Sequence, residues 1–481
     1  MVPLDREVQG IEDSQGGGHG FGSGIVTGDD GHLMSTVGHD RSLGALPTGG
    51  SGCPRHGGIR SRILRDVSVF EVVAVEPAPS RRAWSAPGFA NLWFAGLCWN
   101  WARWGIAFLG AYYVNDVTDS PRLVQLTGSA LWAPLLFGGI LGGVIADRFD
   151  RLRTIRAQLI VLIPMLTAIG VSERFGELRV WMIYPFLVLA GVGWVGDMTS
   201  RRSLIYELVG PSRVDHAMGV EMASTATGVA VGNLLGGALA ESLGVGGAFL
   251  LLAVLMTVGL VALAGVSRTQ FAATELQDRP GVLTELREAV GLARGNRQLR
   301  SILGVTVLAN FFVFAYFPVV QRVGGRLDAS PAQIGLLASM TGFGMMVGSW
   351  VIIRYDPRWR GLMYAGGVAV GMVMLIPFAT APTLWMACLA LFLANCGSGF
   401  FGSTQSTLVL TAVPDEVRGR AMGLLSMSIG ALPVGTFVLG EIAEVHGATT
   451  AVLTMVGMGM VAFTLWLTFA GDVLRLSRAA D

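Results

Sequence analysis

The 481-residue sequence contains no lysine, so arginine supplies all 34 of its basic Lys+Arg positions. We attribute this bias to a GC-rich genome rather than to chemistry. Charged residues of both signs make up only 14% of the chain, whereas soluble domains carry about a quarter. Hydrophobic residues make up 52%. This composition excludes an ordinary soluble domain and predicts a membrane protein, in which apolar runs of about 20 residues span the bilayer.

Cysteine and histidine are also scarce, with four and six residues. The cysteines have neither disulfide-framework nor metal-ligand spacing. Most of the histidines precede the first apolar run, with spacing that fits no metal site: His19, His32, His39 and His56. No histidine is expected at mid-membrane depth, and no soluble domain is long enough for catalysis. We therefore expect no metal, no cofactor and no enzymatic activity.

Residues 1–85 differ from the rest of the chain. They contain Gly-rich stretches such as GGGHGFGSG and TGGSG, scattered charges and no sustained apolar period. Such a segment cannot bury enough surface to offset its chain entropy. We expect a disordered N-terminal extension, or an over-long gene start with Met34 as one alternative.

From Phe89 onward, apolar segments alternate with short polar breaks, which predicts an all-α membrane protein with twelve transmembrane helices in two six-helix bundles. The expected spans are 89–114, 123–146, 154–172, 180–208, 215–240, 246–266, 299–320, 332–353, 361–380, 384–411, 417–443 and 448–471. The expected organisation is an N-terminal bundle at 86–266, a cytoplasmic linker with an amphipathic helix at 267–298, a C-terminal bundle at 299–472 and a cytoplasmic tail at 473–481.

The distribution of arginine orients these helices. With both termini inside, the inside breaks and tail hold 20 arginines and the outside breaks hold five. This asymmetry follows the positive-inside rule and supports an even number of helices. We therefore expect a multi-pass protein of the cell membrane, in contact with the lipid bilayer, with both termini cytoplasmic.

The two predicted bundles also resemble each other in sequence. Residues 202–219 align with 406–423 at an offset of 204, and 142–151 align more loosely with 348–357 at an offset of 206. Both similarities fall at the same place within a six-helix unit. Parallel duplication of six helices is a known plan of transporters.

The loop between the second and third predicted helices carries the first family motif. GGVIADRFDRLR resembles the G-x-x-x-D-R-x-G-R-x-R loop of the major facilitator superfamily, and the likeness extends over roughly residues 87–472. The positions in register are Gly143, Asp147, Arg148, Arg151 and Arg153, while Asp150 replaces the second glycine. The resemblance implies a cytoplasmic gating loop. The alternative is a positive-inside loop with no further role.

The fifth predicted helix carries the second motif. GVAVGNLLGG resembles the superfamily's antiporter motif G-x-x-x-G-P-x-x-G-G. The glycines Gly228, Gly232, Gly236 and Gly237 match, while Asn233 replaces the proline. The resemblance implies export by antiport. The alternative is ordinary close packing of membrane helices through small residues.

Two further stretches resemble one branch of the superfamily. VPDEVRGRAMGLLSMSIGALPVG (413–435) and DMTSRRSLIYELVGPSRVDHAMG (197–219) are similar to macrolide-efflux and enterobactin (siderophore) exporters. An arginine typical of many drug:proton antiporters is absent, because Leu187 stands four residues before Gly191. The branch likeness favours an exporter and does not fix its substrate.

Charges at membrane depth are costly and face a cavity or a partner. Arg103 lies about 21 Å along the first predicted helix, in WNWARW, with Asn100 and Trp104 beside it. It is a candidate cavity cation that meets an anionic substrate group or a titrating acid. The alternatives are a structural ion pair with a neighbouring helix and snorkelling toward the membrane surface.

Two acids and two amides complete the candidate site. Glu221, early in the fifth helix, is a candidate proton carrier, or the partner of a loop arginine near the cytoplasmic face. Asp197, with Arg201 one turn later, is a candidate member of the cytoplasmic gate because acids at this place in the superfamily join the loop arginines; the alternative is contact with the substrate. Asn310 and Asn395 reach mid-membrane depth and either contact substrate or make interhelix hydrogen bonds.

The resemblance therefore predicts a secondary active transporter that works by alternating access. We expect efflux of an amphipathic organic compound (a drug, macrolide or siderophore), with protons as the coupling ion. The expected protein is a monomer with a small-molecule substrate and no nucleic-acid partner. The alternatives are an importer of a small metabolite on the same fold, a membrane-embedded enzyme, and a non-transporting receptor or scaffold.

Overall fold

The computed structural model describes residues 83–137, 150–210, 212–266 and 282–476. These residues belong to one compact unit, Glu76–Asp481. Within them, every regular element is a helix. The predictions for the N-terminal extension and for the loop residues Gly143, Asp147 and Arg148 lie outside the described residues.

Among the described residues, the N-terminal half contains five α-helices: α1 (Phe89–Val117), α2 (Pro121–Trp132), α4 (Arg151–Arg174), α5 (Val180–Val209) and α6 (Val214–Ala262). A 3-10 turn, Ala133–Phe137, continues α2. The long α6 contains two membrane helices, because Gly244 interrupts it with φ 73° and ψ 168°. This left-handed φ suits glycine, which has no Cβ. The break falls between the fifth and sixth predicted spans.

From residue 282 to residue 476 the structure contains nine α-helices: α7 (Val282–Gly295), α8 (Arg297–Leu308), α9 (Val319–Arg326), α10 (Pro331–Tyr355), α11 (Arg360–Thr380), α12 (Leu384–Thr411), α13 (Arg418–Ile429), α14 (Ala431–His446) and α15 (Ala448–Ala470). Helices α8 and α9 form one span, joined through a π turn at Ala309–Val313 and a 3-10 turn at Phe314–Tyr316. Helices α13 and α14 form another. The amphipathic helix predicted in the linker is α7.

Nine segments of the described chain are long and apolar enough to cross a membrane. One of them, His216–Gly265, contains the break at Gly244 and therefore counts as two helices. Helix α1, with 29 residues, adds an eleventh. Helix α2, which the 3-10 turn Ala133–Phe137 continues, adds the twelfth. The prediction of twelve helices in an all-α membrane protein is confirmed.

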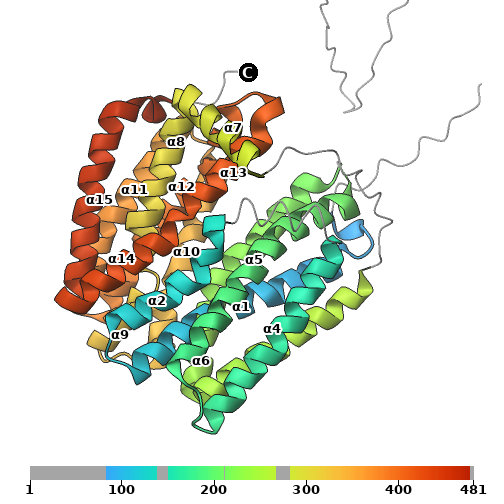
Figure 1. Cartoon of the computed structure of the whole chain (residues 1–481), viewed down its shortest axis with the longest axis vertical. Coiled ribbons are helices and arrows are strands. Elements are labelled where there is room, and N and C mark those ends of the chain that lie inside the picture. The colour runs from blue at the N-terminus through green and yellow to red at the C-terminus, as the bar shows by residue number, and fades with distance from the viewer. Residues whose placement is uncertain (1–82, 138–149, 211, 267–281, 477–481) are drawn as a thin grey trace, which may run out of the picture. The chain divides into compact units, whose positions relative to one another are not determined.

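Helices α1, α2, α4, α5 and α6 pack against one another, as do α8 and α10–α15 (Figure 1). Within the described chain, the halves meet most extensively where α6 packs on α10 and where α2 packs on α14, and α9 also contacts α1 and α2. Small residues permit this approach between membrane helices. A Cβ added to Gly237 of α6 would overlap the carbonyl oxygen of Pro331 on α10.

Hydrogen bonds between the halves gather at the end of the molecule where α1 ends. Arg322 of α9 donates to the Asp119 carbonyl at 2.8 Å and to Asn115 Oδ1 at 3.2 Å. Gln321 donates to the Phe108 carbonyl at 3.4 Å. We call this the closed end. It comprises the C-terminal turns of α1, α9 and α14, the N-terminal turns of α2 and α10, and the part of α6 around Glu241.

Candidate functional site

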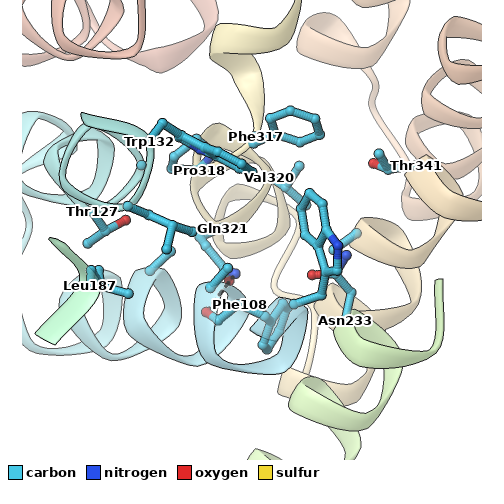
Figure 2. Close-up of a pocket in the computed structure, with 16 residues that line it drawn as sticks. Phe108, Thr127, Trp132, Leu187, Asn233, Phe317, Pro318, Val320, Gln321 and Thr341 are labelled. Atoms are coloured by element: carbon cyan, nitrogen blue, oxygen red, sulfur yellow. Dashed lines mark hydrogen bonds between the residues drawn. The ribbon is translucent and has the colours of Figure 1, made fainter. Parts of the chain in front are cut away.

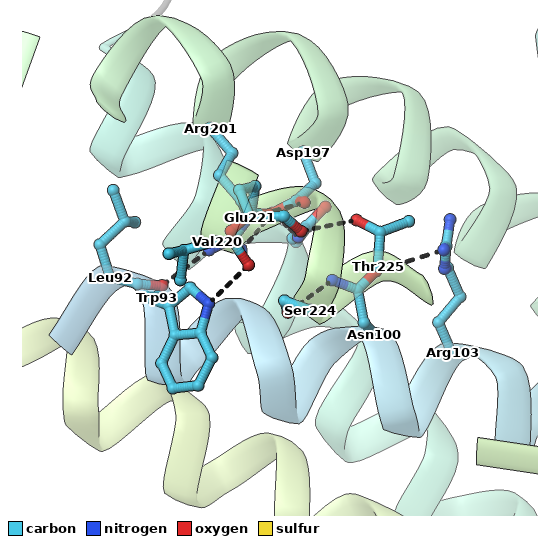
Figure 3. A network of polar contacts seen from close by, with 11 residues as sticks. Leu92, Trp93, Asn100, Arg103, Asp197, Arg201, Val220, Glu221, Ser224 and Thr225 are labelled. Atoms are coloured by element: carbon cyan, nitrogen blue, oxygen red, sulfur yellow. Dashed lines mark hydrogen bonds and ion pairs between the residues drawn. The ribbon is translucent and has the colours of Figure 1, made fainter. Parts of the chain in front are cut away.

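A buried ionic network lies inside the N-terminal half, with Arg201 of α5 at its centre (Figure 3). Arg201 Nη2 donates to Asp197 Oδ1 at 2.6 Å, and Arg201 Nε donates to Asp197 Oδ2 at 3.0 Å. The i, i+4 spacing on α5 places both side chains on one helix face. Arg201 Nη1 donates to the Leu92 carbonyl of α1 at 2.9 Å, and Gln158 of α4 donates to Asp197 Oδ1 at 3.0 Å. The network therefore connects three helices.

Glu221 of α6 is the second acid of this network. Its Oε1 lies 3.9 Å from Arg201 Nε, which is an ion-pair distance and longer than a hydrogen bond. The residue is only 8% exposed, and its Oε2 has no hydrogen-bond partner among the described residues. The Arg201 guanidinium thus faces two buried carboxylates. It donates two hydrogen bonds to Asp197. The sequence raised a loop arginine near the cytoplasmic face as the partner of Glu221; among the described residues the paired arginine is Arg201, which lies within α5.

Arg103 lies farther along α1 and is 4% exposed. Its Nη2 donates to Asn100 Oδ1 at 3.2 Å, and Asn100 Nδ2 donates to Ser224 Oγ at 3.3 Å. Among the described residues, no hydrogen-bond partner lies at its Nε or Nη1. The guanidinium carbon lies 4.3 Å from the centre of the Trp194 ring and 5.5 Å from that of Trp104, so cation–π contacts stabilise the charge.

Aromatic side chains surround a small cavity between the halves (Figure 2). Trp132 packs against Trp104, Trp194 and Phe317, with ring centres 4.7–6.1 Å apart. The cavity of about 50 Å³ has polar groups from Thr127, Asn233, Gln321 and Thr341 in its lining. This volume has room for a few water molecules. A drug-sized compound requires a wider conformation.

Asn310 and Asn395 make hydrogen bonds within the C-terminal half. Asn310 Nδ2 donates to the Thr306 carbonyl, one turn earlier on its own helix, at 2.9 Å. Asn395 of α12 exchanges hydrogen bonds with the Tyr316 hydroxyl, which also lies 3.1 Å from Thr341 Oγ1. Neither amide lines the cavity described above. For Asn395 this hydrogen bond corresponds to the interhelix alternative given in the sequence analysis.

The described part of the family loop shows how its arginines are held. Asp150 caps α4, because its Oδ1 accepts from the Arg153 backbone N–H at 2.7 Å. Arg151 forms an ion pair with Glu207 near the end of α5. Asp197, expected to join these arginines, has Arg201 and Gln158 as its hydrogen-bond partners.

The glycine motif of the fifth membrane helix packs in two directions. Gly228, Gly232 and Gly236 face α1, where a Cβ on Gly232 would lie 2.6 Å from the Trp101 carbonyl oxygen. Gly237 faces α10 of the other half. Asn233 donates to the Val229 carbonyl at 2.7 Å and lines the cavity. The motif thus sets both the α1 contact and a contact between halves.

Sequence reasoning did not select Arg201, Trp132, Trp194, Phe317 or Gln321 as site residues. The signal for Arg201 was available, since it follows Asp197 by one helical turn. Gly96 on α1 makes room for the Arg201 side chain, because a Cβ there would lie 2.8 Å from Arg201 Nη1. The cavity aromatics come from different helices, and no spacing rule connects them.

A polytopic α-helical protein with two packed bundles, buried charges and a cavity between them is a membrane transporter. The model of the Major Facilitator Superfamily matches residues 92–436, and the chain belongs to this family.

Curated relatives are similar over most of their length. The chain is 26% identical to the enterobactin exporter EntS of Salmonella choleraesuis over 369 residues, covering 74% of this chain and 84% of the relative. It is 25% identical to the multidrug resistance protein MdtG of Serratia proteamaculans, covering 63% and 74%. It is 20% identical to macrolide efflux protein A of Streptococcus pyogenes, covering 69% and 84%. The prediction of this branch of the family is confirmed.

Solved structures show the same fold. A bacterial homologue of the human lysosomal transporter Spinster superposes with a TM-score of 0.65 at 16% identity, covering 84% of this chain and all of that one. A POT family transporter in complex with 5-aminolevulinic acid superposes with a TM-score of 0.65 at 14% identity, covering 80% and 97%. The major facilitator fold is therefore confirmed.

Proposed function

We propose that this transporter exports an amphipathic organic compound by alternating access and exchanges it for protons. The observation that supports proton coupling is the position of Glu221. This buried carboxylate lies beside Arg201, which already donates two hydrogen bonds to Asp197. The efflux direction draws support from the relatives, whose names describe export of enterobactin, macrolides and multiple drugs.

The proposed proton site consists of Asp197, Arg201 and Glu221. A buried ion is stable only when its charge and hydrogen-bonding groups are satisfied. Asp197 meets this condition with three hydrogen bonds, two from Arg201 and one from Gln158. Glu221 has one oxygen at 3.9 Å from Arg201 and one oxygen without a partner among the described residues. Glu221 is therefore the group that takes up and releases the proton, and Arg201 stabilises its charged form.

The proposed substrate site adjoins Arg103 and the aromatic cavity. Arg103 offers Nε and Nη1 to a polar or anionic group, and Asn100 and Trp104 hold its guanidinium in place. The rings of Trp104, Trp132 and Phe317 offer faces to an apolar body. An amphipathic compound combines these two features. Asn310 and Asn395 are proposed to act in the C-terminal side of the pathway once it widens.

The remaining predictions complete the proposal. The two bundles comprise residues 86–266 and 299–472 of a monomer in the cell membrane, with both termini cytoplasmic. The closed end is then the outer face. The cytoplasmic gate is proposed to include Asp147, Arg148, Arg151 and Arg153 of the family loop, together with Asp197.

Accumulation assays test the export direction. Cells that express the protein are loaded with a macrolide or with enterobactin, and efflux is followed before and after a protonophore collapses the proton gradient. We expect expression to lower accumulation and the protonophore to abolish the difference. Higher accumulation in expressing cells would indicate import, and efflux that persists after the collapse would exclude proton coupling.

A further inference from the structure

Glu444, near the end of α14, binds the N-terminus of α2 in the other half. Its Oε2 accepts from the Ser120 hydroxyl at 2.6 Å and from the Arg122 backbone N–H at 3.0 Å. Ser120 is the N-cap of α2, and its hydroxyl oxygen also accepts from the Leu123 N–H at 3.3 Å. The serine therefore joins its own helix to the carboxylate of the opposite half.

Glu241, in the middle of α6, binds the N-terminus of α10 in the same way. Its Oε2 accepts from the Ser330 hydroxyl at 2.6 Å and from the Ala332 backbone N–H at 2.9 Å. Ser330 is the N-cap of α10, and its hydroxyl oxygen accepts from the Gln333 N–H at 3.4 Å. Each contact again crosses from one half to the other.

The local sequence explains this geometry. In both helices proline follows the capping serine, at positions 121 and 331. Proline has no N–H, so the first backbone donor of each helix belongs to the residue after it. That N–H and the serine hydroxyl converge on one carboxylate oxygen. The helix N-terminus carries unsatisfied N–H groups and a partial positive charge, which both favour a carboxylate.

The two contacts are related by the internal repeat. The capping serines are 210 residues apart and the glutamates 203, close to the offsets of 204 and 206 that relate the halves in sequence. Helices α2 and α10 begin the second and eighth membrane spans, while Glu241 and Glu444 end the fifth and eleventh. Equivalent places in the two halves thus carry the same Ser-Pro cap and the same acid.

Close helix packing accompanies each contact. Beside Glu241, Gly237 allows α6 to approach Pro331 and Gly335 of α10. Beside Glu444, Gly440 allows α14 to approach α2, where an added Cβ would lie 2.9 Å from Gln125 Cβ. Both acids therefore sit at the edge of a tight contact between halves, and these contacts break when the halves separate at this end.

We propose that Glu241 and Glu444 are paired latches of the transport cycle: each carboxylate caps the first turn of a helix in the opposite half and holds the closed end shut. The proposal rests on the transporter assignment and the alternating access proposed above, and it is independent of the substrate, the coupling ion and the direction of transport. Because the latches share no residue, their effects on the opening equilibrium add.

Cysteine accessibility measures this equilibrium directly. Thr127→Cys, in a background without the four native cysteines, places a buried thiol in the cavity beneath the closed end. A membrane-impermeant maleimide then reacts at a rate proportional to the open population when opening is fast. The rate is measured in intact cells and in inside-out vesicles, so the side from which the reagent enters also tests the orientation.

We expect Glu241→Gln and Glu444→Gln each to raise the labelling rate about threefold, and the double variant about tenfold, on one side of the membrane only. Ser120→Ala and Ser330→Ala each remove one hydrogen-bond donor, and they should raise the labelling rate by less than the glutamate variants do. Glu177→Gln, an exposed acid in the loop between α4 and α5, is the matched control and should leave the rate unchanged.

The proposal is overturned if the double variant, purified as a monodisperse protein, is labelled at the control rate from both sides. It is also overturned if Glu177→Gln raises the rate as much as the latch variants do. If the double variant does not fold, the serine variants decide, because wild-type rates in both of them contradict the latch. Labelling needs no substrate or proton gradient, so loss of proton-coupled export leaves this result intact.

Discussion

Replacing the two acids of the buried network one at a time separates a structural ion pair from a proton carrier. Asp197→Asn removes the charge that receives two hydrogen bonds from Arg201, whose side chain is 2% exposed. Breaking a buried pair by removing one partner costs about 3–5 kcal/mol. Glu221 lies 3.9 Å away and retains part of the compensation. We therefore expect this variant to lose about 3 kcal/mol of stability, the lower end of that range.

Glu221→Gln should behave differently. Arg201 keeps both hydrogen bonds to Asp197 and the one to the Leu92 carbonyl, and the unpartnered Oε2 loses its charge. We expect a change in stability of less than about 1 kcal/mol, which is the scale of a single replaced hydrogen bond. Proton-driven transport should be lost, because the amide does not titrate.

Thermal unfolding in one detergent, with substrate exchange measured in parallel, compares the two variants. The ordering of the transition temperatures is the readout, because large proteins often depart from two-state unfolding, and the free energies given above set the expected order. Asp197→Asn should unfold at a distinctly lower temperature than Glu221→Gln. Equal destabilisation by both variants, with gradient-driven transport intact in Glu221→Gln, would refute the assignment of Glu221 as the proton carrier.

Three further variants test other parts of the site. Gly237→Leu should abolish transport, because the added side chain prevents the close approach of α6 to Pro331 of α10. The control Gly402→Ala, which has nothing within 4 Å of its added Cβ, should transport normally in the same flux assay. Arg103→Met removes a buried, incompletely paired charge, so its unfolding temperature should be unchanged or higher while substrate flux falls at least about tenfold; normal flux would remove Arg103 from the substrate site. Arg151→Ala breaks the pair with Glu207 and should reduce transport with normal expression, and unchanged efflux would contradict its gating role.

The helix spans were predictable because the bilayer requires long apolar segments with internally satisfied backbones. The break inside α6 was located because polar and glycine residues interrupt the apolar run near Gly244. The course of the seventh span was not predicted. Arg322 and Arg326 were expected in an outside break, yet both lie within α9, which follows the π and 3-10 turns at 309–316. Their side chains donate to the backbone carbonyls of Asp119 and Ala379, respectively.

The burial of Arg103 and Asp197 was also predictable, because depth along a helix follows from residue count. The sequence did not, however, predict which neighbouring helix each of these side chains faces. Arg201 appeared to be one more cytoplasmic arginine, and only the packing of α5 against α1 and α6 places it between Asp197 and Glu221. The latches were hidden for the same reason, since Ser120 and Glu444 meet only when distant parts of the chain fold together.

Simultaneous measurement of proton and substrate flux in one set of proteoliposomes tests the central claim most directly. With wild-type protein, substrate movement should be accompanied by proton movement in the opposite direction. With Glu221→Gln, substrate exchange at equilibrium should continue while the accompanying proton flux disappears. Proton flux that persists undiminished in Glu221→Gln, or protons that move in the same direction as the substrate in wild type, would contradict the account.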